Sequence, residues 1–106
     1  MTDKELLELA AKAAGIEYWL VRFAPRSARI EKLHTTVNGE TVEWNPLTDD
    51  GDALRLAVKL EMLLDLCGDE TAAYCQEWCR EKKENDAYAT TRRAIVRAAA
   101  EVGKLK

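Results

Sequence analysis

Residues 44–60, WNPLTDDGDALRLAVKL, combine the end of a strand, a turn and the start of a helix. Pro46 keeps the residue before it out of the helical region, so the chain turns at this point. Thr48, Asp49 and Asp50 then supply side-chain oxygens that can accept hydrogen bonds from the first turn of a helix. Apolar residues follow at helical spacing: Ala53, Leu54, Ala57, Val58 and Leu60. The stretch predicts a strand, a turn and a capped helix.

The acidic residues of this turn allow a second interpretation. Asp49, Asp50 and Asp52 carry the oxygen ligands that Ca²⁺ and Mg²⁺ prefer. The glycine-bearing twelve-residue loop that ends in a bidentate glutamate is missing, however. We therefore favour helix capping and predict no metal site here.

Helical patterns also stand at both ends of the chain. Thr2 and Glu5 have the spacing of a capping box, and Gly15 suits a helix end, so a helix is predicted over residues 3–14. A last helix is predicted to follow Asp86 and to end at Gly103. Its apolar face would comprise Tyr88, Thr91, Ile95, Ala98 and Val102. We expect the three helices to share a core of Leu6, Ala10, Leu54, Val58, Ile95 and Ala98.

The region between the first two helices reads as strands. Residues 17–24, EYWLVRFA, are rich in β-branched and aromatic side chains, and Pro25 ends the run. Residues 27–37 form a second extended run, and residues 40–44 a third. Asn38 and Gly39 between them are the pair favoured in a type I′ turn, where both central residues need positive φ. The sequence predicts a hairpin here.

Residues 60–83, LEMLLDLCGDETAAYCQEWCREKK, permit two interpretations. The abundance of Leu, Met, Ala, Glu and Gln favours two helices separated by Gly68. Alternatively, residues 62–67 and 72–79 form a second hairpin around Gly68. The residue pattern leaves both open.

Length and composition exclude several classes of protein. A chain of 106 residues, 47% hydrophobic and 33% charged, predicts one globular domain over residues 1–106. The net charge of −3 argues against a general binder of nucleic acid or anionic membranes. No apolar run approaches the length of a membrane span, and the N-terminus lacks the pattern of a signal peptide. We expect a cytoplasmic protein without membrane association.

No catalytic constellation or cofactor motif is recognisable. His34 is the only histidine, and no nucleophile stands near it in the sequence. Cys75 and Cys79 have the spacing of one zinc-ligand pair, but Cys67 and His34 make no second pair. Without an export signal, the three cysteines are expected to be free thiols. A small enzyme or metal-binding protein using His34 and the cysteines is the least favoured alternative.

Basic residues gather in two regions, which supports a further alternative. A nucleic-acid-binding surface would use six arginines: Arg22, Arg26, Arg29, Arg92, Arg93 and Arg97. Acidic residues alternate through both regions, so ion-paired, solvated faces are the simpler interpretation.

Three segments carry a resemblance to a known family: MTDKELLELAAKAAGIE, WNPLTDDGDALRLAVKL and DAYATTRRAIVRAAAEVGK. Together they resemble small proteins of tailed phages and prophages, of the group described as phage ABA-sandwich (alpha-beta-alpha) or NinX-like domains. The resemblance implies a sheet flanked by helices and favours the hairpin interpretation of residues 62–79. It brings no catalytic residues.

We therefore expect an α+β domain in which three helices pack on a small antiparallel sheet of four to five strands, similar to an α-β-α sandwich. The expected function is that of a phage accessory protein, acting without catalysis in the host cytoplasm by docking onto a host protein or complex, such as a defence or regulatory complex. Four residues of types enriched in binding hot spots are candidates for the docking surface: Trp19, Arg22, Tyr74 and Trp78. An exposed apolar sheet face would also permit a homodimer.

Overall fold

The computed structural model describes the backbone of residues 1–23 and 30–106, and the side chains of residues 1–19 and 33–106. Three helices form a central layer: α1 (Asp3–Ala14), α2 (Asp50–Lys59) and α3 (Ala87–Lys104). Sheet A stands on one side of them, with β1 (Trp19–Phe23), β2 (Ile30–Val37) and β3 (Glu40–Glu43) in that order. Sheet B covers the other side, with β4 (Leu63–Asp65), β5 (Glu70–Tyr74) and β6 (Trp78–Lys82).

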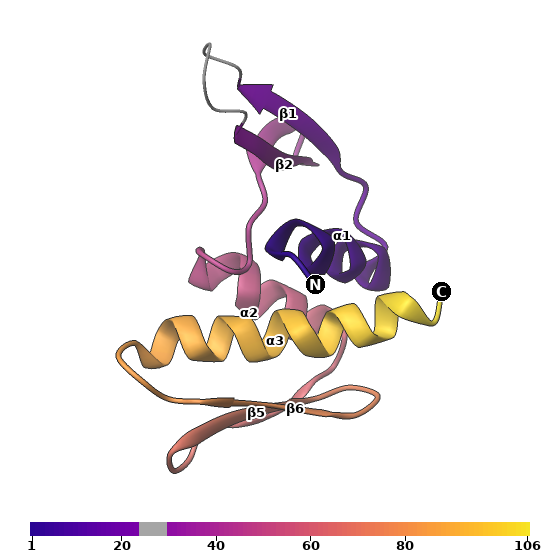
Figure 1. Cartoon of the computed structure of the whole chain (residues 1–106). Helices are drawn as coiled ribbons and strands as arrows, with labels where there is room; N and C mark the ends of the chain where they lie inside the picture. The colour runs from indigo at the N-terminus through magenta and orange to yellow at the C-terminus, as the bar shows by residue number, and fades with distance from the viewer. Residues whose placement is uncertain (24–29) are drawn as a thin grey trace.

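The α+β class, with three helices and antiparallel strands, is confirmed. The strands divide between two three-stranded sheets, and the helices lie between these sheets (Figure 1). An α-β-α sandwich would instead place helices on the outside of one sheet.

Helices α1 and α3 pack closely and run in the same direction. The Arg93 guanidinium lies 3.3 Å from the Asp3 carboxylate near the start of α1, and Lys106 donates a 2.9 Å hydrogen bond to the Ala13 carbonyl near its end. A Cβ atom at Gly103 would lie only 2.0 Å from the Leu9 carbonyl oxygen. The prediction that Gly103 ends the last helix is wrong: α3 continues to Lys104, and the glycine lets the two backbones approach.

Helix α3 lies at the centre of the fold and buries residues on two faces. On one face, Ile95 and Val96 join the main core with α1, α2, Leu33 and Trp44. On the other, Ala94 and Ala98 pack against Ala73 and Cys79 of sheet B. Because Ala94 and Ala98 are small, sheet B can approach this face of α3 while the main core covers the other face.

Helix α2 turns a different face inward from the one expected. Asp49, one of the three predicted capping candidates, is its N-cap and accepts a 2.8 Å hydrogen bond from the Asp52 N–H. Its buried residues are Ala53, Leu56 and Ala57. The prediction that Leu54 and Val58 belong to the core is wrong, because they are 60% and 67% exposed. The helix is covered on one side only, and a helical stripe centred on Leu56 points to that side.

Sheet A contains the predicted hairpin. Asn38 and Gly39 have φ of 51° and 82°, as a type I′ turn requires. The base of the sheet is tied to the helices by a 2.8 Å hydrogen bond from the Thr35 hydroxyl to the Glu17 carbonyl. The buried side chains of Leu33 and Trp44 complete this attachment.

Residues 62–79 contain β4, β5 and the start of β6 and no helix, so the hairpin interpretation is confirmed over the helical one. Gly68 has φ of 81° in the turn between β4 and β5. A further turn follows at residues 75–77, so the expected second strand is divided into β5 and β6. Helix α2 stops because Glu61, at φ of 53°, allows the Met62 N–H to bond back to the Ala57 carbonyl. This is the hydrogen-bond pattern of a Schellman motif, with glutamate where glycine is usual.

Candidate functional site

The outer face of sheet B carries the strongest candidate binding surface. Side chains alternate along each strand, so Tyr74 and Trp78 point away from α3 while Ala73 and Cys79 point toward it. Tyr74 is the cross-strand partner of both Trp78 on β6 and Leu63 on β4. Three large apolar side chains therefore stand side by side on a face that forms the outer surface in Figure 1.

The aromatic pair on this face has a defined geometry. The ring centroids of Tyr74 and Trp78 lie 5.1 Å apart with an interplanar angle of 41°. The Arg80 guanidinium lies 5.4 Å from the centroid of the Trp78 ring, within the range of a cation–π interaction. Tyr74 is 40% exposed and Trp78 42%. We call Leu63, Tyr74, Trp78 and Arg80 the sheet B patch.

The structure brings together only two of the four predicted partner-binding residues. Trp19 lies on sheet A, on the opposite side of the helical layer from Tyr74 and Trp78. Arg22 belongs to β1, but its side chain lies outside the described residues. Sequence reasoning missed Arg80, although it lies two residues after Trp78 and so shares its face once β6 is recognised.

The arginines of the last helix are engaged in structural contacts. Arg92 donates hydrogen bonds to the Leu47 carbonyl at 2.8 Å and to Asp50 at 2.6 Å. Arg97 bonds Glu81 at 2.6 Å, and this hydrogen bond raises the pKa of Arg97 above its ordinary value. Arg93 binds Asp3, as described above.

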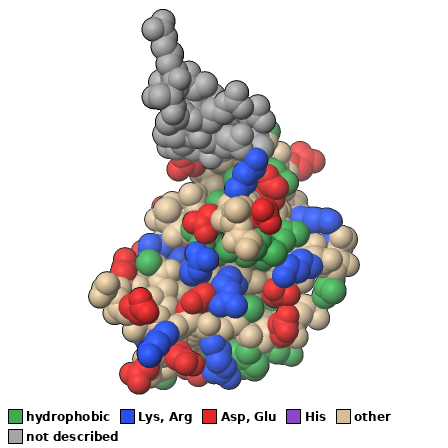
Figure 2. Space-filling view, viewed as in Figure 1, with side chains coloured by type: hydrophobic (Ala, Val, Ile, Leu, Met, Phe, Trp, Pro, Cys, Tyr) green, Lys and Arg blue, Asp and Glu red, His purple; other side chains and the backbone are tan. Residues whose placement is uncertain are grey.

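Opposite charges are also mixed on the visible surface. Figure 2 shows basic and acidic side chains interspersed over the described part of this face. Of the remaining candidates for nucleic-acid binding, Arg26 and Arg29 lie outside the described residues, and so does the side chain of Arg22. Arg92, Arg93 and Arg97 are each paired with a carboxylate: Asp50, Asp3 and Glu81 respectively.

His34 and the cysteines do not converge. His34 lies in β2 of sheet A, whereas Cys79 lies in β6 of sheet B, on the other side of the helices. Cys67 is exposed, and the half-buried Cys75 thiol donates to the Leu60 carbonyl at 3.6 Å. Burial raises the pKa of the Cys79 thiol, which opposes formation of the reactive thiolate. Among the side chains of residues 1–19 and 33–106, no group of three or more His, Cys, Asp or Glu residues is placed to hold a metal ion.

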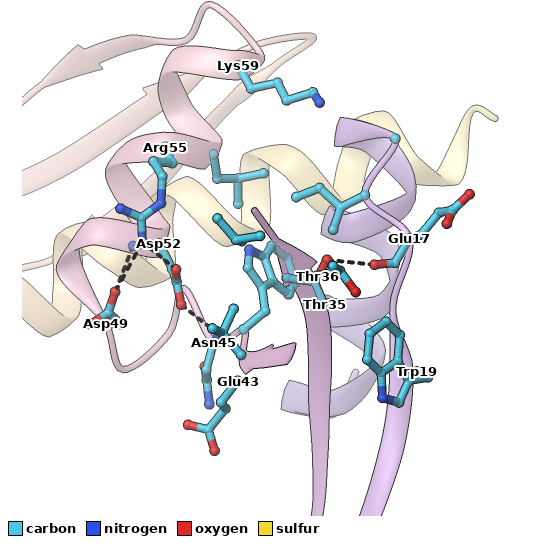
Figure 3. A pocket seen from close by; sticks show the side chains of 16 residues that line it. Glu17, Trp19, Thr35, Thr36, Glu43, Asn45, Asp49, Asp52, Arg55 and Lys59 are labelled. Carbon is cyan, nitrogen blue, oxygen red and sulfur yellow. Dashed lines mark hydrogen bonds and ion pairs between the residues drawn. The ribbon is translucent and has the colours of Figure 1, made fainter. Parts of the chain in front are cut away.

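A groove with a volume of 820 Å³ lies between sheet A and α2 (Figure 3). Trp44 and Leu56 contribute apolar surface, and Trp19 stands at the side. Three charged groups at the start of α2 bind each other: Arg55 lies 2.7 Å from Asp52 and 3.8 Å from Asp49. Asp52 also accepts a 3.0 Å hydrogen bond from the Asn45 N–H. These carboxylates brace the turn before α2, so the groove offers shape but no unengaged acidic pair.

Comparisons with known protein families, with curated proteins and with solved structures find no match to this chain. In the described part of the chain, none of the helices combines the length and apolar character needed to cross a membrane.

Proposed function

We propose that this chain is a bacteriophage or prophage accessory protein that works without catalysis, docking through the sheet B patch onto a host protein or complex in the bacterial cytoplasm. The observation that carries the proposal is the exposed, mutually packed pair Tyr74 and Trp78, with Arg80 against the tryptophan ring. Tyr, Trp and Arg are the residue types most enriched in binding hot spots.

The geometry of the patch suits it to binding. Because the two rings already rest on each other across neighbouring strands, they lose little conformational freedom when a partner covers them. Leu63 extends the apolar surface beyond Tyr74, and Arg80 supplies hydrogen-bond donors at its margin. An apolar centre with a polar margin is the usual arrangement of a protein interface.

The proposal is tested by pull-down from a lysate of the bacterial host, with the tagged chain and two variants. The double variant Tyr74→Ser/Trp78→Ser removes the aromatic pair. The matched control is Trp19→Ser, which removes a tryptophan of similar exposure from the other side of the molecule. We expect a host protein in stoichiometric amount with the parent chain and with the control, and its loss with the double variant.

The loss of affinity in the double variant is then measured by calorimetry with the purified partner. Removing two hot-spot aromatics should weaken the affinity at least about 30-fold, equivalent to about 2 kcal/mol. Equal retention by the parent chain and the double variant would refute the role of the sheet B patch. Recovery of nucleic acid alone, lost as salt is raised, would instead favour the arginine-based alternative.

A further inference from the structure

A second hollow lies between α2, α3 and the strand β4, away from the outer face of sheet B. It has a volume of 420 Å³, within the range of small-molecule sites. Its walls are mainly apolar and come from all three elements: Ala53, Leu54, Leu64, Leu66, Tyr88 and Ile95. We call it the α2–α3 pocket.

Several large side chains in the wall of this pocket are exposed to solvent. Leu54 is 60% exposed, Leu66 52% and Tyr88 72%. Ala53 and Ile95, which also line the pocket, are buried. Isolated exposed apolar residues need no explanation, but several around one concavity are typical of a binding site.

The charges at the margin of the pocket are not balanced. Asp50 and Arg92 neutralise each other at 2.6 Å. Lys83 remains, and its ammonium donates a hydrogen bond to the Leu66 carbonyl, which holds it beside the apolar wall. Within the described residues, no carboxylate forms an ion pair with Lys83. An ammonium has three N–H donors, so Lys83 can still bind an anion.

We propose that the α2–α3 pocket binds an amphipathic carboxylate, with its apolar chain or ring against Leu54, Leu66 and Tyr88 and its carboxylate on the Lys83 ammonium. The apolar body would cover the exposed side chains, and the carboxylate would accept a hydrogen bond from the Lys83 ammonium. The apolar volume and the unneutralised cation together define this ligand chemistry. The inference does not depend on the proposed docking role of the sheet B patch.

The probes are octanoate and 1-octanol, which share a chain length and differ in charge. Each is titrated into the full chain and followed by amide chemical shifts of Leu54, Leu66 and Tyr88. Octanoate should shift these signals in a saturable manner and bind about tenfold more tightly than 1-octanol, because a charge-assisted hydrogen bond adds to the apolar contact. Equal affinity for the two probes, or no saturable shift at these residues, would overturn the proposal.

Substitutions separate the charge from the apolar wall. Lys83→Met keeps an apolar stem and should lower octanoate affinity about tenfold while leaving 1-octanol affinity unchanged. Lys82→Met is the matched control, because Lys82 is exposed at the adjacent position of the chain. Equal effects of the two lysine variants would overturn the assignment of Lys83.

Leu54→Gln tests the wall without threatening the core, since Leu54 is largely exposed. It should weaken both probes to a similar degree, and unchanged binding would contradict the pocket. If the same signals shift on dilution of the protein alone and octanoate does not compete, a second copy of the chain occupies this face, and the ligand proposal is wrong.

Discussion

Gly103→Ala provides a sharp test of the packing between α1 and α3. Alanine is favoured over glycine inside a helix by about 1 kcal/mol, so helix propensity alone predicts a stabilised protein. The added Cβ, however, would lie 2.0 Å from the oxygen and 2.7 Å from the carbon of the Leu9 carbonyl, and both are backbone atoms. No change of rotamer relieves this contact, so the helices must separate by roughly 1 Å, which forfeits a quarter to a half of each affected dispersion contact.

Overpacking of this kind against rigid backbone should cost about 3 kcal/mol, and the propensity gain offsets about 1 kcal/mol of it. We therefore expect the free energy of unfolding to fall by about 2 kcal/mol and Tm to fall by about 10 °C. The measurement is urea denaturation followed by circular dichroism at 222 nm, with a thermal scan beside it.

The matched control is Gly51→Ala in α2. A Cβ there would meet only side-chain atoms, of the Arg55 guanidinium and the Asp49 carboxylate, each at 3.2 Å, which need to shift by only a few tenths of an ångström. The same substitution should therefore leave stability unchanged or raise it by up to about 1 kcal/mol. If Gly103→Ala were equally neutral or stabilising, the close approach of α1 and α3 would be wrong.

Four other measurements test local features of the fold. Glu61→Gly should raise the free energy of unfolding by about 1 kcal/mol in urea denaturation, because Glu61 has φ of 53° and glycine adopts this conformation without steric cost; a loss of stability would contradict the Schellman end of α2. Asp49→Ala should lower the free energy of unfolding by about 1 kcal/mol, whereas Asp49→Asn, which keeps a capping oxygen, should retain most of it. Titration with a thiol reagent should modify Cys67 first, Cys75 more slowly and Cys79 only on unfolding, so three fast thiols would refute the burial of Cys79. Burial raises the pKa of the Cys79 thiol above its value in the unfolded chain. The stability that the protonated thiol contributes is therefore complete below the unfolded pKa and is lost as pH rises through the folded pKa. Cys79→Ala should remove this part of the fall in the free energy of unfolding at alkaline pH.

Features governed by neighbouring residues were predictable from the sequence. Thr2 and Asp49 cap their helices as expected, because a cap needs only a side-chain oxygen within three residues of a free N–H. The Asn38-Gly39 hairpin was equally predictable, since its backbone angles belong to those two residues. The end of α2 at Glu61 could not be predicted in the same way, because glutamate is not a residue type that favours positive φ.

The candidate site was predictable only in part. Tyr74 and Trp78 were identified as residue types suited to binding, but their contact depends on the register of β5 against β6. The pairing of Arg97 with Glu81 likewise depends on α3 lying against β6.

The sequence by itself determined where the helices start, where the first hairpin turns and that residues 60–83 had two open conformations. Only the tertiary structure decided which conformation formed, which face of α2 is buried and why Gly103 is a glycine. The physical reason is the separation of the interacting residues along the sequence. Caps and turns are stabilised by hydrogen bonds between residues a few positions apart. Burial instead depends on which distant element arrives, and here α3 separates the two sheets and leaves Leu54 at the surface.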